Sequence, residues 1–404
     1  RLIAHAGDTE IWDWLRIGHI RPGCSPLRHT PSYEQWLLDI LNHTCHDAYW
    51  RSMGYGPLPY YATHADVPTL YLGGWYDSYA RSAVENFVSL RARGSAPIHL
   101  LMGPWEHGSR GGDVNVGDAR FPVGVGRLDY DEIHLRWFDR WLKGVDNAVE
   151  REDPVQYFIM GNGPEQDPVQ RPIRPGGEWR TCPDWPPPGM VPTAYYLHAD
   201  GSLDTLPPAT ESSTTSYVFD PADPVPTIGG NLSAIAVPAG PFDQRHDSRF
   251  PTCRGSLPLC ARTDVLSFWT PTLDEPLETA GPVEARLWVA TDGLDTDFTA
   301  KLIDCYPPSK EFPDGCALNL TDSILRLRFR ESYDCEKLAE PGTVYELRFQ
   351  LYPTAICFAA GHRIRIDISS SNFPRFDVNP NTGGPLGCDR TRRCAHNTLF
   401  HDRT

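Results

Sequence analysis

Several common sequence features are missing from this chain of 404 residues. No apolar run is long enough to span a bilayer, and no signal peptide is visible, so the sequence gives no reason to expect a membrane partner. Internal repeats and low-complexity tracts are absent too, which excludes a repeat architecture. Lys and Arg number 37 against 52 Asp and Glu, for a formal net charge of −15. Because phosphate neutralisation needs clustered cations, this balance argues against a nucleic-acid partner.

The cysteines lack the spacing of a metal or redox motif. There are 11 of them, with no Cys-x-x-Cys pair. Cys388 and Cys394, near His396, do not have zinc-ligand spacing, so no metal site is expected. Three close pairs could each close a small loop in an oxidising compartment or remain free thiols in a reducing one: Cys253/Cys260, Cys305/Cys316 and Cys388/Cys394. The sequence leaves the compartment open.

What the chain does contain suits a packed globular enzyme of two or three domains, since 40% of its residues are hydrophobic and 12 are Trp. Residues 1–60 have helical periodicity without strand patterns, and a helix is predicted from about Tyr33 to about Asn42 with Ser32 as its cap. This part is therefore expected to be a short helical block.

Residues 61–150 alternate between strand and helix patterns. Strands are predicted at 67–72 and 97–102, with helices at about 79–92 and 129–143. Such alternation indicates βαβ units on a parallel sheet. Two strands cannot form a sheet that is covered on both faces, so further strands must come from elsewhere in the chain.

Residues 151–404 have a different pattern. A strand is predicted at 153–160, followed by a Pro-rich connector near 183–192. Short runs then alternate between apolar and polar residues, as in an antiparallel sandwich with one face in solvent; they cover 194–198, 283–289, 298–303, 324–329, 344–349 and 363–368. An eight-stranded jelly roll is the expected form.

Two short motifs follow the predicted strands of the middle segment. Gly73-Gly-Trp-Tyr-Asp77 follows the first, and Gly103-Pro-Trp-Glu-His107-Gly follows the second. Alone, Asp77 would more often be a helix cap and His107 a structural histidine. Together, on successive strand ends and in the order Asp then His, they match the last two members of a Ser…Asp…His triad.

The first member of such a triad is not visible. A nucleophile elbow has the pattern Gly-x-Ser-x-Gly, and only Gly23-Cys-Ser25 begins in that way. Leu27 stands where the second Gly is needed, and Pro26 has no N–H to donate to an oxyanion. Ser78, beside Asp77, lies on the wrong loop. The chain therefore contains a candidate base and its orienting acid without the group they serve.

The two motifs and three C-terminal segments resemble the CocE/NonD family of serine hydrolases. The segments are Gly281-Pro-Val-Glu-Ala-Arg-Leu-Trp-Val289, Asp295-Thr-Asp-Phe-Thr-Ala-Lys-Leu302 and 361–377, extended by Asn379-Pro-Asn-Thr-Gly-Gly384. The resemblance implies an α/β-hydrolase domain with a helical cap, followed by a jelly roll. By position it makes Asp77 the triad acid and His107 the triad base. Tyr79 matches an aromatic position that lines the acyl pocket, although helix packing alone also accounts for it. No metal or cofactor is implied.

Members of this family carry a long segment ahead of the point where this sequence begins, with the Ser elbow, an oxyanion-hole Tyr and part of the cap. We therefore expect a partial cap at 1–60, the C-terminal part of the α/β-hydrolase domain at 61–150 and the jelly roll at 151–404. The expected substrate is a small ester or amide, and a complementary N-terminal chain would supply the Ser. This chain alone is expected to be inactive. A homo-oligomer is compatible with the sequence.

Alternatives remain at this stage. Within the same chemistry, the enzyme could be a carboxylesterase, an α-amino-acid ester hydrolase or acylase, or an X-prolyl dipeptidyl peptidase. From another class, the jelly roll could be a non-catalytic binding module, because such folds often bind sugars. That alternative leaves the Asp77/His107 pair unexplained.

Overall fold

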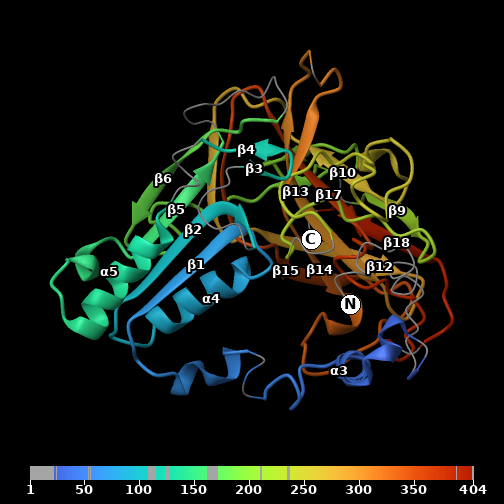
Figure 1. The fold of residues 1–404 in the computed structure, drawn as a ribbon. Coiled ribbons are helices and arrows are strands. Elements are labelled where there is room, and N and C mark those ends of the chain that lie inside the picture. The colour runs from blue at the N-terminus through green and yellow to red at the C-terminus, as the bar shows by residue number, and fades with distance from the viewer. Residues whose placement is uncertain are drawn as a thin grey trace.

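The computed structural model describes residues 22–23, 25–52, 54, 56–107, 115–122, 128–161, 172–209, 212–233, 237–310, 312–387 and 389–402. In this part of the chain, one mixed sheet with flanking helices lies beside two antiparallel sheets (Figure 1). The remaining short elements are η1 (Pro26–His29), η2 (Leu58–Thr63), η3 (Val149–Arg151), η4 (Leu259–Ala261), β3 (Asn115–Val116), β4 (Ala119–Arg120), β7 (Tyr196–Leu197) and β8 (Leu203–Asp204).

The mixed sheet begins with three parallel strands, β1 (Thr69–Tyr76), β2 (Ile98–Glu106) and β5 (Val155–Met160). β1 and β2 overlap the two predicted strands, but each begins one or two residues later and ends four residues further along the chain. The helix α4 (Ala80–Arg91) connects them and buries Ala83, Val84, Phe87 and Leu90 against the sheet. The predicted βαβ unit is therefore present, and it places the ends of β1 and β2 at the same edge of the sheet.

The strands that the sequence left unlocated come from beyond residue 150. β6 (Gly177–Cys182) pairs antiparallel with β5. β16 (Thr354–Phe358) meets β5 at Ile356↔Met160, and β11 (Leu277–Gly281) pairs antiparallel with β16. The sheet thus runs across the boundary expected at residue 150, and the division into domains stays a prediction.

The structure shows where the other two predicted helices begin and end. α5 (Tyr130–Lys143) begins where the Asp129 carboxylate accepts the N–H of Glu132, and it ends at Gly144 in the left-handed conformation. α3 (Pro31–Asn42) begins earlier than predicted. Ser32 is not its cap: the helix starts at Pro31, whose fixed φ suits the first helical position, and Thr30 precedes it without a side-chain cap.

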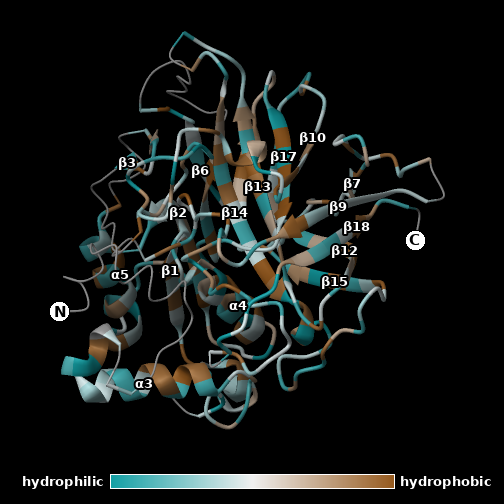
Figure 2. Cartoon of the chain, turned by 90° about the vertical axis from the view of Figure 1, so that its right-hand side faces the viewer, coloured by the Kyte–Doolittle hydropathy of each residue, from teal (hydrophilic) through white to brown (hydrophobic). Residues whose placement is uncertain are grey.

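The C-terminal half forms a sandwich of two four-stranded antiparallel sheets, as the jelly-roll expectation requires. Alternating brown and teal along β17 and β12 in Figure 2 shows the period-2 pattern that the sequence predicted. One sheet has the order β10 (Leu266–Trp269), β17 (Arg363–Ser369), β13 (Asp297–Tyr306), β14 (Cys316–Arg326); the other has the order β15 (Tyr345–Gln350), β12 (Glu284–Thr291), β18 (Ala395–Phe400), β9 (Thr214–Phe219).

The strand predicted at 324–329 is wrong in its second half. β14 ends at Arg326, and Leu327–Phe329 form the 3-10 turn η5. Arg328 causes this change, because its backbone N–H and its guanidinium both donate to the buried carboxylate of Asp295. Because its partner is buried, the charged Arg328 side chain points into the core. Successive side chains then no longer alternate between the core and solvent.

A continuous apolar core joins the two halves. Trp75 and Phe158 from the mixed sheet and Phe298 and Leu347 from the sandwich belong to one buried cluster. Cys253, Cys260 and Cys305 are free thiols, so neither the Cys253/Cys260 nor the Cys305/Cys316 pair is joined, while Cys24 and Cys388 lie outside the described ranges. Among the same residues, no helix is long and apolar enough to cross a membrane, and no cluster of potential metal ligands occurs.

Burial of His99 on β2 makes stability depend on pH. Its ring packs edge-on against Trp137 of α5, with the ring centroids 5.2 Å apart, and burial lowers the pKa of His99 below its ordinary value of 6.5. Below pH 6.5 the unfolded chain binds a proton at His99 that the folded chain does not bind. The free energy of unfolding therefore falls as the pH drops below 6.5, whereas above that pH this contribution to stability is fully present. We expect wild type to lose more stability than His99→Phe between pH 7.5 and 5.5 in urea unfolding. Equal losses would contradict this assignment.

Candidate active site

The glycines of the two motifs allow the ends of β1 and β2 to approach each other closely, an arrangement called the interlock below. Gly74 pairs with Gly103, but Tyr76 pairs with Glu106, so β2 contains one extra residue at this point. A side chain at Gly74 would overlap the carbonyl oxygen of Trp105, and one at Gly103 would overlap the Trp105 ring. Both glycines are needed for this close approach. The register therefore brings Asp77 and His107, the next residues of each strand, side by side.

Asp77 is not the helix cap, because the N-cap of α4 is Tyr79. The two carboxylate oxygens of Asp77 make separate contacts. Its Oδ1 accepts the backbone N–H of Tyr79 at 2.8 Å, which forms the turn that leads into α4. Its Oδ2 lies 3.2 Å from Nδ1 of His107. The side chain is only 13% exposed, so solvent competes little for either contact.

His107 presents its other nitrogen to the outside. A carboxylate oxygen can only accept, so Nδ1 holds the hydrogen and Nε2 keeps a free lone pair. In the described part of the chain, Nε2 makes no hydrogen bond, and the side chain is 45% exposed. This arrangement fits a general base, because the imidazole is held on one side and accessible on the other.

Tyr79 lies next to the imidazole. Its ring centroid is 5.1 Å from that of His107, with the planes inclined by 58°, and the side chain is mostly exposed. Helix packing does not account for this position, because Tyr79 precedes α4 and its ring is not in the core. The side chain instead forms an aromatic wall beside the candidate base.

The two serines weighed as nucleophiles are engaged elsewhere. Ser25 is buried, its Oγ donates to Glu34 at 2.6 Å, and the same oxygen accepts the N–H of Leu27 to cap η1. Ser78 follows Asp77 directly, and its Oγ lies 2.7 Å from Oγ of Ser233. No hydrogen bond between His107 and a serine occurs among the described residues.

Sequence reasoning missed the segment that holds the acid loop in place. Asn231 is buried and donates to the carbonyl of Trp75, while the N–H of Leu232 donates to the carbonyl of Tyr76 at 3.3 Å. Ser233 then contacts Ser78. Three consecutive residues from beyond position 230 thus contact the residues on both sides of Asp77. No local motif signals this contact, because the partners are about 155 residues apart.

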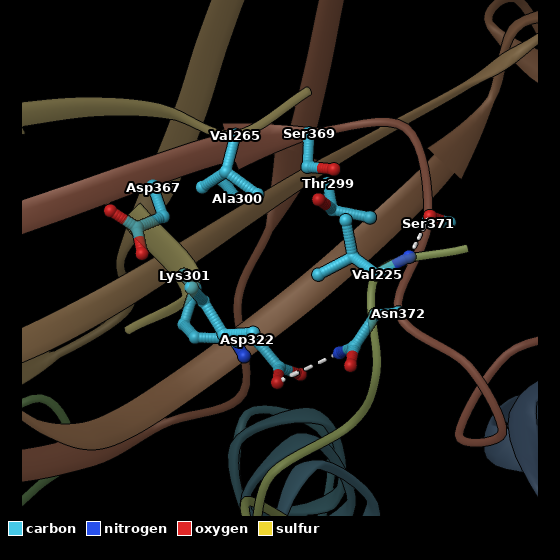
Figure 3. Close-up of a pocket in the computed structure, with 11 residues that line it drawn as sticks. Val225, Val265, Thr299, Ala300, Lys301, Asp322, Asp367, Ser369, Ser371 and Asn372 are labelled. Carbon is cyan, nitrogen blue, oxygen red and sulfur yellow. Dashed lines mark hydrogen bonds between the residues drawn. The ribbon is translucent and has the colours of Figure 1, made fainter. Parts of the chain in front are cut away.

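A polar cavity in the sandwich is separate from this pair. Figure 3 shows Lys301, Asp322, Asp367 and Ser369 among the residues that line it. Lys301 Nζ donates to Gln244 Oε1 at 2.7 Å, and burial lowers the pKa of Lys301. The cavity volume is about 20 Å³, which fits about one water molecule and is too small for an ester substrate.

Gly74→Ala tests the interlock of the two loops. The added methyl would meet the backbone of Trp105, which cannot move without breaking the pairing of β1 with β2. We expect a loss of about 3 kcal/mol in the free energy of unfolding, or failure to fold. Gly56→Ala is the matched control, because no atom lies within 4 Å of the added carbon. Equal stability of the two variants would contradict the interlock.

Comparison with known proteins places this geometry in a family. Residues 22–109 match the X-Pro dipeptidyl-peptidase (S15 family) model, a range that includes both Asp77 and His107. Residues 147–404, more than half of the chain, match the X-Pro dipeptidyl-peptidase C-terminal non-catalytic domain. Cocaine esterase from Rhodococcus sp. (strain MB1 Bresler) is 36% identical over 366 residues, which cover 87% of this chain and 56% of that protein.

The chain belongs to the CocE/NonD hydrolase family. Among solved structures, an aminopeptidase from a marine sediment Thaumarchaeota archaeon has a TM-score of 0.78 at 26% identity, over 96% of this chain and 62% of that one. An α-amino-acid ester hydrolase has a TM-score of 0.73 at 26% identity, over 92% and 60%. The expected CocE/NonD fold, an α/β-hydrolase part followed by a sandwich, is confirmed. The chain spans between half and two thirds of the length of these relatives.

Proposed function

We propose that this chain supplies the acid and base of a serine hydrolase that cleaves carboxylic esters or amides through an acyl-enzyme. The observation on which the proposal rests is the contact between His107 Nδ1 and Asp77 Oδ2 at 3.2 Å, with Nε2 accessible. The family supports the same chemistry, because the relatives include a cocaine esterase and an α-amino-acid ester hydrolase. A binding module would have no use for such a pair.

The proposed mechanism assigns one role to each group. A serine hydroxyl attacks the substrate carbonyl, and Nε2 of His107 takes its proton as the general base. Asp77 holds the imidazole in the Nδ1–H tautomer and stabilises the imidazolium. The imidazolium then gives its proton to the leaving group, and a water molecule, deprotonated by the same nitrogen, hydrolyses the acyl-enzyme. Tyr79 lines the acyl side of the site.

The nucleophilic serine lies on a segment outside these 404 residues in this proposal. Two observations support it: the sequence has no Gly-x-Ser-x-Gly elbow, and the chain covers 56% of cocaine esterase. The hydroxyls of Ser25 and Ser78 are already engaged in other contacts. The active enzyme would then contain this chain together with a complementary segment.

Turnover of p-nitrophenyl acetate tests the proposal. We expect no hydrolysis above background with the purified chain. Hydrolysis should appear when the chain is fused to the part of cocaine esterase that precedes its match to this sequence. Turnover by the isolated chain that disappears in His107→Ala would contradict the placement of the serine outside it.

The substrate class follows from three probes used on the same fusion. Faster turnover of phenyl acetate than of phenylglycine methyl ester indicates a carboxylesterase, and the reverse order indicates an amino-acid ester hydrolase or acylase. Release of p-nitroaniline from an Ala-Pro anilide indicates an X-prolyl dipeptidyl peptidase. We expect phenyl acetate to be preferred, because the described wall of the site at Tyr79 is aromatic and uncharged.

A further inference from the structure

The segment that follows α3 docks on a distant turn of the sandwich. The N–H of His46 donates to the carbonyl of Tyr333 at 2.7 Å, and the Thr44 hydroxyl donates to Glu336 at 2.7 Å. His46 Nδ1 also lies 3.4 Å from an oxygen of Asp334. Position 44 therefore faces 336 and position 46 faces 334, which is an antiparallel approach. Figure 1 shows α3 below the sandwich strands, where this contact is made.

This contact has a cysteine at the centre of each segment. Cys45 lies between Thr44 and His46, and Cys335 lies between Asp334 and Glu336. Both cysteines lie in bends, and each is flanked on both sides by residues that contact the other segment. The main-chain hydrogen bond from His46 to Tyr333 holds the two backbones together beside the cysteines. A disulfide joins residues whose Cα atoms are about 4.4 to 6.8 Å apart, so it needs a close backbone approach of this kind.

We propose that Cys45 and Cys335 form a disulfide that ties the N-terminal segment to the sandwich. Both are free thiols in the structure, Cys335 exposed and Cys45 half-buried. The remaining described cysteines have no comparable arrangement on opposed segments so far apart in sequence. The proposal does not depend on the catalytic roles given to Asp77 and His107.

The segment with Cys45 and the turn with Cys335 are each held in place by contacts of their own. Glu336 accepts from the buried guanidinium of Arg328 at 3.0 Å, which fixes the turn that contains Cys335 to the sandwich core. On the other side, the rings of His43 and Tyr49 stack with centroids 4.3 Å apart, and Trp50 Nε1 donates to the carbonyl of His43. The two thiols are thus presented on preformed turns, so little ordering is needed to join them.

The bond forms by thiol–disulfide exchange with a low-molecular-weight disulfide such as glutathione disulfide. The exposed Cys335 thiolate attacks one sulfur of that reagent and releases one thiolate. The Cys45 thiolate then attacks the Cys335 sulfur of the mixed disulfide and releases the second. Two protein thiols are oxidised by two electrons, the reagent is reduced to two thiols, and the two cysteine protons end on them.

The cross-link is expected to stabilise the fold, because it closes a loop of about 290 residues in the unfolded chain. We expect Tm to rise by roughly 5 °C on oxidation with glutathione disulfide, and to return to its original value after reduction. Cys335→Ser should abolish the increase. Cys394→Ser, which removes another exposed cysteine, should retain it.

Peptide mapping gives the direct test. Trypsin releases Cys45 in the peptide 29–51 and Cys335 in the peptide 331–337, and neither peptide contains a second cysteine. The oxidised monomer, alkylated and digested without reduction, should yield these two peptides joined, two hydrogens lighter than their sum. Recovery of both as separate alkylated or glutathionylated peptides would overturn the proposal. A Tm increase that persists in Cys335→Ser would overturn it too.

Discussion

The His107→Ala variant of the reconstituted enzyme is expected to hydrolyse p-nitrophenyl acetate at least about 10⁴-fold more slowly than the enzyme with His107. Without the imidazole no group takes the serine proton, because Nε2 is the accessible one of the two ring nitrogens of His107. The measurement is kcat for the fusion of this chain with the part of cocaine esterase that precedes its match to this sequence. KM should change much less, since the imidazole acts mainly in the transition state.

His64→Ala is the matched control for this prediction. His64 is exposed, and within the described ranges its Nδ1 contacts just the carbonyl of the next residue, Ala65. Its removal should leave kcat within about twofold of wild type, because such surface changes are mostly neutral. A similar loss in both variants would mean that histidine replacement harms the fold and that His107 has no special role.

Asp295→Ala is expected to lower the free energy of unfolding by about 3 to 5 kcal/mol. Asp295 and Arg328 are fully buried, and the carboxylate accepts from both the backbone and the guanidinium of Arg328. Asn379 donates to the same carboxylate at 2.9 Å. Removal of Asp295 leaves a buried cation without its main partner, which is the costly change. Urea unfolding measures the loss.

An exposed ion pair on the same sandwich provides the comparison. Arg286 Nε donates to Glu346 at 2.6 Å, but the two side chains are 49% and 35% exposed. Glu346→Ala should cost less than about 1 kcal/mol, because water screens and replaces such a contact. If the two variants lost equal stability, burial would not be what makes the Asp295–Arg328 pair important.

Local patterns predicted the part of the fold that depends on neighbours in sequence. The strands before Asp77 and His107, the helix between them and the sandwich strands β12, β13, β15 and β17 follow from apolar periodicity. The sandwich strands β9, β10 and β18 are not among the predicted runs. Asp129 and Gly144 mark the two ends of α5 through chemistry that is visible in the sequence. The site pair was predictable for the same reason, since Asp77 and His107 end neighbouring parallel strands.

The rest depends on contacts between distant residues. β11 and β16 complete the mixed sheet from about 120 and 190 residues beyond β5, and no local pattern distinguishes them from sandwich strands. Asn231 reaches the acid loop in the same way. The turn at Leu327–Phe329 replaces a strand because Arg328 has a buried partner, and the sequence does not show which residues will be its neighbours.

Labelling with a fluorophosphonate tests the central claim most directly, because the reagent reacts covalently with an activated serine. The fusion should be labelled at a serine outside these 404 residues, and His107→Ala should abolish that labelling. The isolated chain should remain unlabelled. A phosphonylated peptide from within the chain, at Ser25, Ser78 or any other serine, would show that the chain contains its own nucleophile and would contradict the account.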